Sequence, residues 1–123
     1  LHASVLGLLT AAIPLKSIAT AVALAIPSDD SNSIIADPSA REAETAGSLH
    51  VLSFTSDSEL LLAESEGSFT PEEWEQILQA GQHVCCQSDD DKPMQDSGLE
   101  STSIKSFIRS VMETKTAGDL HWK

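Results

Sequence analysis

The sequence predicts an α+β domain in which two β-hairpins pack with helices, followed by an amphipathic tail helix. Three features predict this class: short apolar runs bounded by Pro, Gly and Ser/Asp clusters, a strongly capped helix after the second pair of runs, and apolar residues at helical spacing near the C-terminus. The 123 residues, 41% of them hydrophobic, are enough to form one domain with a core of its own.

The excess of acidic over basic residues bears on whether the chain binds nucleic acid. Lys and Arg number 7 against 19 Asp and Glu, which gives a net charge of -12. Because affinity for phosphates comes from clustered Lys and Arg, this balance argues against a free-standing nucleic-acid binder, though not against RNA contact through a partner's surface. The two cysteines, Cys85 and Cys86, are adjacent and cannot form a disulfide framework, which indicates a reducing compartment.

The first part of the chain predicts a buried helix and a hairpin. Residues 1–12 are small and apolar and end at Ile13-Pro14, where the residue before proline avoids helical geometry. Residues 17–26, rich in small and β-branched side chains, predict a buried strand, and residues 34–38 predict a short second strand after a polar turn. A polar linker with room for one helical turn follows at 41–47. Since the chain begins inside a helical pattern without a cap, we expect it to be a fragment of a larger domain.

The N-terminal apolar region is not predicted to be a signal peptide or a membrane span. No basic segment precedes it, and Pro14 and Lys16 interrupt its apolar run.

The second hairpin is predicted at 49–66. Residues 49–54 are apolar at most positions, which predicts a strand buried on both faces, and residues 55–58 form a turn cluster. Residues 59–66 predict the returning strand, with 60–63 at its centre and Gly67 at its end.

The helix after this hairpin has the strongest start signal in the chain. Thr70 is a good N-cap, Pro71 suits the first helical position, and Glu73 completes a capping box. Phe69 and Trp74 stand at the two positions of a hydrophobic staple. A single apolar stripe follows, formed by Trp74, Ile77, Leu78, Gly81, Val84 and Cys85.

The composition changes after Cys86. We therefore divide the chain into a partial domain at 1–86, an acidic flexible linker at 87–98, and an amphipathic helix and tail at 99–123. The tail helix is predicted by the spacing of Ile104, Phe107, Ile108, Val111 and Met112, with Gly118 as its C-cap. This helix either packs on the domain or docks on a partner, and the sequence favours neither strongly.

Three residue groups have the side-chain types of a chemical site. Asp89, Asp90 and Asp91 suggest a cation site, but a charge run in a linker is usually solvated. His83, Cys85 and Cys86 lack the second ligand pair of a zinc site, which makes Cys85 a core residue and Cys86 partly exposed. Glu64 and Glu66 share one strand face, which an exposed sheet explains more simply than acid–base work. Spacing alone therefore predicts no catalytic residue, metal or cofactor.

Three segments in order, HASVLGLLTAAIPL, ADPSAREAETAGSLHVLSF and LLLAESEGSFTPEEWEQIL, resemble the C-terminal half of an RNase PH-type domain. The resemblance covers residues 1–86 and is strongest to ring subunits of the eukaryotic RNA exosome. It implies a ribosomal protein S5 domain 2-like half-domain, whose N-terminal part carries the rest of the sheet.

Active members of that family shorten RNA from its 3′ end by phosphate attack and hold two aspartates, whose matching positions here are Glu42 and Ser48. A hydroxyl at Ser48 cannot supply the charge that a divalent ion or an acid–base step needs. The resemblance therefore implies a non-catalytic ring subunit, found in the nucleus, nucleolus and cytoplasm, that supports RNA decay and rRNA maturation. Its implied partners are other ring subunits and cap subunits, with RNA contacted indirectly through the ring channel and no membrane.

Two alternatives stay open. One is an active phosphorolytic exoribonuclease of the same fold, in which another carboxylate such as Glu44 replaces the missing one. The other is an unrelated protein-interaction module that folds alone as a monomer.

Overall fold

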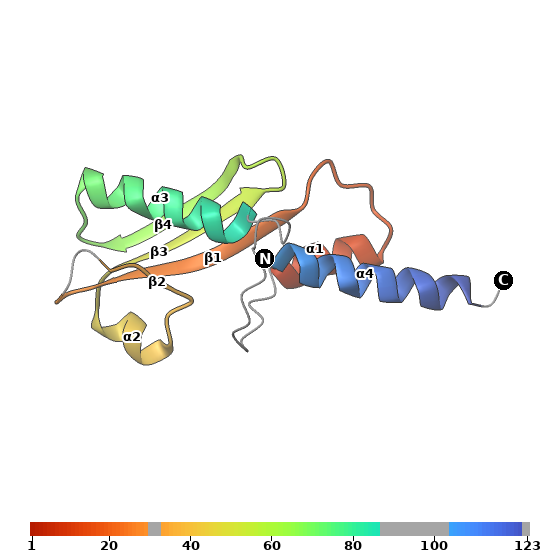
Figure 1. The fold of residues 1–123 in the computed structure, drawn as a ribbon, viewed down its shortest axis with the longest axis horizontal. Helices are drawn as coiled ribbons and strands as arrows, with labels where there is room; N and C mark the ends of the chain where they lie inside the picture. The colour runs from red at the N-terminus through yellow and green to blue at the C-terminus, as the bar shows by residue number, and fades with distance from the viewer. Residues whose placement is uncertain (30–32, 87–103, 122–123) are drawn as a thin grey trace, which may run out of the picture.

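The computed structural model describes residues 1–29, 33–86 and 104–121, and the described strands form one antiparallel sheet in the order β2-β1-β3-β4 (Figure 1). The strands are β1 Ala19–Pro27, β2 Ile35–Ala36, β3 Ala46–Thr55 and β4 Leu60–Gly67. The helices are α1 His2–Thr10, α2 Ala40–Thr45, α3 Pro71–Cys86 and α4 Ile104–Leu120. The α+β class and the two predicted hairpins, β1–β2 and β3–β4, are confirmed.

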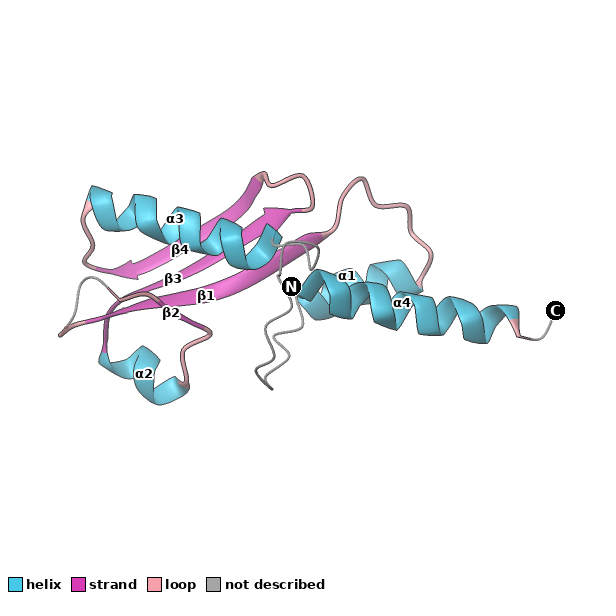
Figure 2. Ribbon diagram, viewed as in Figure 1, coloured by secondary structure: helices cyan, strands magenta, loops and turns pink. Residues whose placement is uncertain are grey.

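The centre of the sheet is the long β1–β3 pair, which joins the two hairpins. Its register runs from Ala19 opposite Thr55 to Ile26 opposite Ser48. Strand side chains alternate between faces, so this register puts Val22 and Leu24 of β1 on the same face as Leu52 of β3, the face that α3 packs against. Figure 2 shows α3 lying along one side of the sheet. The pairing explains why β1 and β3 are the buried strands of the sheet.

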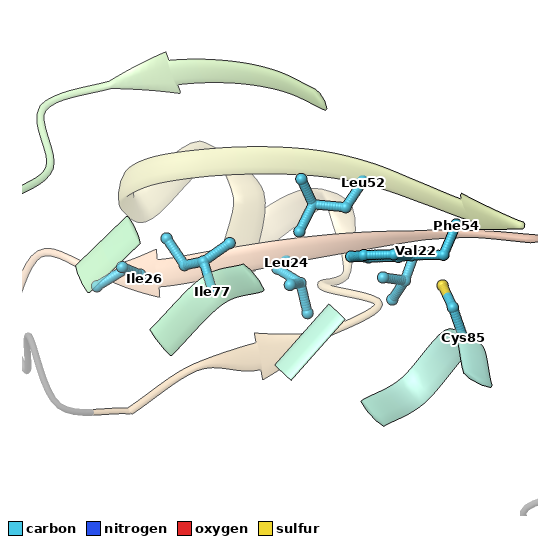
Figure 3. Close-up of a cluster of buried hydrophobic side chains, with 7 residues drawn as sticks. All are labelled: Val22, Leu24, Ile26, Leu52, Phe54, Ile77 and Cys85. Carbon is cyan, nitrogen blue, oxygen red and sulfur yellow. The ribbon is translucent and has the colours of Figure 1, made fainter. Parts of the chain in front are cut away.

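The core lies between α3 and the β1–β3 pair (Figure 3). It consists of buried apolar side chains from three elements: Val22, Leu24, Ile26, Leu52, Phe54, Ile77 and Cys85. Gly81 is buried where α3 packs closely on the sheet, since a Cβ at this position would lie 2.7 Å from Leu52 Cδ1. The absence of a side chain at Gly81 therefore sets the distance between helix and sheet.

The capped start of α3 is confirmed. Thr70 Oγ1 accepts a hydrogen bond from the Glu73 backbone N–H at 3.2 Å, and the Glu73 carboxylate accepts one from the Thr70 N–H at 2.6 Å. The rings of Phe69 and Trp74 lie 5.7 Å apart, as the staple requires. The apolar stripe faces the sheet, although Trp74 is only half-buried.

Several burial predictions were wrong. Helix α1 was predicted to be buried, but Val5 is its one buried residue, and its main contact with the sheet is with β1. On β3, Leu49 and Val51 are half-buried instead of buried, since they point away from α3. For strand β4 no burial was predicted; it is exposed along its whole length at the end of the sheet, which agrees with the exposed sheet face expected for Glu64 and Glu66.

The tail forms helix α4, which contacts α1 and α3 and buries Ile108. Gly118 lies inside this helix with no positive φ, so the prediction that it caps the C-terminus was wrong. The predicted linker at 87–98 and the residues before Ile104 lie outside the described residues. No helix in the described parts of the chain is long and apolar enough to cross a membrane.

Candidate functional site

Glu42 is the third residue of α2, a helix that begins at Ala40 and overlaps the segment 41–47, which was predicted as a polar linker with room for one helical turn. Its Oε2 accepts hydrogen bonds from the Ser39 backbone N–H at 2.8 Å and from the Ser39 hydroxyl at 2.7 Å. Ser39 Oγ in turn accepts from the Glu42 N–H at 3.4 Å, which completes a capping box. The hydrogen bonds from Ser39 lower the pKa of the Glu42 carboxyl below its ordinary value. The carboxylate of Glu42 is thus held by the start of its own helix.

Ser48 lies on β3, facing α3, and is 3% exposed. Its Oγ lies 3.0 Å from Nε2 of His50, and Nδ1 of the same ring lies 2.9 Å from Oγ of Ser65 on β4. A neutral imidazole donates from one ring nitrogen and accepts at the other, so it satisfies both hydroxyls. The hydrogen bonds run from Ser48 through His50 to Ser65 and so link β3 to β4.

Aromatic rings enclose His50, which is fully buried. Phe69 meets the imidazole edge-on with ring centroids 4.8 Å apart, and Trp74 lies 5.9 Å away. Burial lowers the pKa of His50 below its ordinary value of 6.5, and the Glu73 carboxylate opposes this shift. The ring is therefore neutral at physiological pH and acts as a structural link between strands.

This arrangement supplies no pair of free carboxylates at positions 42 and 48. Glu42 is engaged by Ser39, and Ser48 presents an uncharged, buried hydroxyl to His50. Glu44, the alternative carboxylate, is exposed on α2. Within residues 1–29, 33–86 and 104–121, no three His, Cys, Asp or Glu side chains gather closely enough to hold a metal ion.

The other candidate residues are spread over the fold. Glu64 and Glu66 lie on β4 opposite Val51 and Leu49, on the sheet face turned away from α3, and both are exposed.

At the end of α3, His83 is exposed, Cys85 is buried and Cys86 is half-buried, as predicted for the cysteines. Burial raises the pKa of the Cys85 thiol, which makes it a packing residue. Asp89, Asp90 and Asp91 lie outside the described residues.

Three features were not predicted from the sequence. The first is the Ser48–His50–Ser65 chain, whose His50–Ser65 contact depends on strand register. The second is an apolar groove of about 850 Å³ between α1 and α4, bordered by Lys105 and Arg109. The third is the Ser39–Glu42 capping box, although its S-x-x-E spacing is a local signal of a helix start.

Comparison with known families gives a decisive match. Residues 17–84, which contain β1 through most of α3, match the family described as "3′ exoribonuclease family, domain 2". The chain belongs to this family. The RNase PH resemblance is thereby confirmed. The second and third segments and positions 42 and 48 lie inside the matched residues, and the first segment lies before them.

A solved structure has the same fold. The crystal structure of Rrp46 from rice (Oryza sativa) superposes with a TM-score of 0.65 at 21% identity, over 91% of this chain and 45% of the rice chain. This chain therefore spans less than half the length of the rice protein. The comparison with curated proteins found no match. The fold is that of an RNase PH-type domain 2, similar to the one in rice Rrp46.

Proposed function

We propose that this chain is a non-catalytic ring subunit of an RNA exosome, of the type that rice Rrp46 represents. One observation carries the proposal: neither position that matches the family's aspartates offers a free carboxylate. Glu42 caps α2, and Ser48 is a buried hydroxyl bonded to His50.

The chemistry of phosphorolysis supports this reading. Binding a divalent ion or stabilising charge beside a phosphate needs oxygen ligands that carry negative charge and face the substrate. The Ser48 side chain faces the protein interior, and recruiting Glu42 would break both hydrogen bonds from Ser39 to its carboxylate.

A ring role agrees with family membership, with the rice Rrp46 fold and with the net charge of -12, which disfavours direct RNA binding. Ring closure would be head-to-tail, with different surfaces of each subunit in contact. The subunit would then support 3′ to 5′ RNA decay and rRNA maturation by associated nucleases, in the nucleus, nucleolus and cytoplasm. Its partners would be other RNase PH-type ring subunits and cap subunits, and RNA would pass through the assembled channel.

The deciding experiment compares the parent chain alone with the parent chain co-purified with RNase PH-type ring subunits. Each sample is given a single-stranded RNA labelled at its 5′ end, with and without inorganic phosphate, and RNA length is followed over time. A bacterial RNase PH serves as the active control. We expect co-assembly, and no phosphate-dependent shortening by the chain alone.

Two outcomes would replace the proposal. Phosphate-dependent shortening by the isolated chain, lost in Glu44→Gln, would establish the active exoribonuclease with Glu44 as the substitute carboxylate. A monomer that binds no ring subunit and leaves RNA intact would favour the unrelated interaction module.

A further inference from the structure

His50 is a titratable side chain that lies buried beneath the start of α3. Its exposed fraction is 0%, and its two ring nitrogens contact the hydroxyls of Ser48 and Ser65 at 3.0 and 2.9 Å. Phe69 and Trp74 pack against the ring, with centroids 4.8 and 5.9 Å away. All these contacts lie within residues 48–74, so they do not depend on a surface that another part of the parent chain covers.

The residues paired with His50 on its neighbouring strands are neutral. His50 lies opposite Leu24 of β1 and Ser65 of β4. From α3, the Glu73 carboxylate is the charged group that acts on the imidazole, and it favours the protonated form. Burial has the larger and opposite effect, so the pKa of His50 lies below 6.5. The closed structure therefore favours the neutral ring.

Protonation of His50 would disturb this site in two ways. It would place a charge in a buried position, where the charged form is disfavoured. It would also turn both ring nitrogens into donors, so the hydroxyl that had donated to the ring would lose its acceptor. Both costs are relieved when water reaches the imidazolium.

The cover over His50 belongs to the first turn of α3 and the residues just before it. Phe69 is 40% exposed, and Trp74 is half-buried. The backbone of this turn is held by the capping box between Thr70 and Glu73 and by a 3.0 Å bond from the Trp74 N–H to the Thr70 carbonyl. Helix ends that are held by a few local hydrogen bonds open at low free energy.

The other walls of the site are held more firmly. Strand β4 is paired with β3 from Leu60 to Gly67, with one register shift. Beyond its first turn, α3 is anchored by Ile77, Gly81 and Cys85, which are buried against the sheet. Water therefore reaches His50 at the lowest cost when the first turn of α3 opens.

We infer that His50 is an acid-sensitive switch for the start of α3. When the imidazole takes up a proton, the first turn of α3 opens together with Phe69 and Trp74, while the β3–β4 pair and the rest of the helix stay in place. The aromatic cover of the sheet at this end thereby becomes an exposed pair of rings. The switch depends on contacts within one domain, so it is independent of the proposed ring role.

The test follows amide hydrogen exchange in the parent chain between about pH 5 and pH 7.5, where histidine titrates and carboxylates stay largely ionised. Each rate is compared with the intrinsic exchange rate at the same pH, which gives a protection factor. Exchange that does not respond to added urea reports local opening, whereas exchange through global unfolding accelerates with urea. Only the urea-independent exchange is compared between pH values.

The capping box of α2 is the matched internal control. Ser39 and Glu42 cap that helix as Thr70 and Glu73 cap α3, but their hydrogen bonds are with each other and not with a histidine. We expect protection of the Glu73 and Trp74 amides to fall by up to about tenfold per pH unit below 6.5, because one proton is taken up on opening. Protection of the Glu42 amide should not fall.

Two histidine variants separate His50 from a general effect of acid. His50→Asn should remove the fall in protection at the start of α3, and His83→Asn, at an exposed position on the same helix, should leave it unchanged. Glu73→Gln gives the answer if His50→Asn does not fold. Glutamine serves in a capping box as glutamate does, but it lacks the charge that favours the protonated ring, so the fall should extend to lower pH and become larger.

A fall confined to the start of α3 and removed by His50→Asn alone supports the switch. Loss of protection by the same factor at the Glu42 amide, or urea-independent opening in the β3–β4 pair instead of the first turn of α3, would overturn it. A fall that persists in His50→Asn, is lost in His83→Asn, is no larger in Glu73→Gln, or is absent from the unaltered chain would overturn it equally.

Discussion

Replacing Gly81 with alanine tests the helix–sheet packing most directly. The added Cβ would lie 2.7 Å from Leu52 Cδ1, 3.2 Å from Phe54 Cε2 and 3.5 Å from Leu24 Cδ1, whereas ordinary contact begins near 3.4 Å. Leu52 and Leu24 are fully buried, so their methyl groups have no solvent into which to move. The substitution must therefore displace either these side chains or α3.

Two opposing effects decide whether Gly81→Ala raises or lowers the free energy of unfolding. Alanine is a better helix former than glycine by about 1 kcal/mol. Overpacking a closed core costs about 1–3 kcal/mol. Since the closest contact is far inside the ordinary limit and both leucines are confined, we expect packing to win and the free energy of unfolding to fall by about 1 kcal/mol.

The matched control is Gly7→Ala in α1, where an added Cβ would meet nothing within 4 Å. At Gly7 only the higher helix propensity of alanine over glycine acts, so we expect the free energy of unfolding to rise by up to about 1 kcal/mol. Urea unfolding followed by circular dichroism measures both variants. If Gly81→Ala stabilises the protein as much as Gly7→Ala does, α3 does not approach the sheet as the structure places it.

Three further predictions concern the α3 start and the buried histidine. Burial lowers the pKa of His50 in the folded state below the ordinary value of 6.5. Near and below pH 6.5 the unfolded state therefore binds more protons than the folded state. The free energy of unfolding should fall as the pH drops below that value. Urea titrations at several pH values should show this slope, and His50→Asn should reduce it; a slope unchanged by the substitution would refute the assignment. Trp74→Ala should cost about 3 kcal/mol, the lower end for a large aromatic because the side chain is half-buried, and a loss below about 1 kcal/mol would mean that the aromatic cluster with Phe69 contributes little. Thr70→Ala removes the N-cap of α3 and should cost about 1 kcal/mol by the same assay, whereas an unchanged midpoint would show that the cap is not needed.

The sequence determined the features that depend on neighbours along the chain. The start of α3 was predictable because Thr70, Pro71 and Glu73 act within one turn of each other. Both hairpins were predictable because turn residues separate apolar runs of strand length. The family was recognisable from ordered segments of the sequence, and the family match confirms it. The correspondence of Glu42 and Ser48 to the family's aspartates stays a prediction.

The tertiary structure decided which faces are covered and what the side chains at those two positions contact. The β1–β3 pairing joins strands far apart in the sequence, and its register brings Val22 opposite Leu52 beneath α3. Helix α3 covers only part of the sheet, so an apolar strand such as β4 is left exposed despite its leucines. The bonding of His50 to Ser65 likewise follows from the β3–β4 register, which places the two residues opposite each other. These contacts arise between residues distant in sequence, where local propensity and periodicity carry no information about which partners meet.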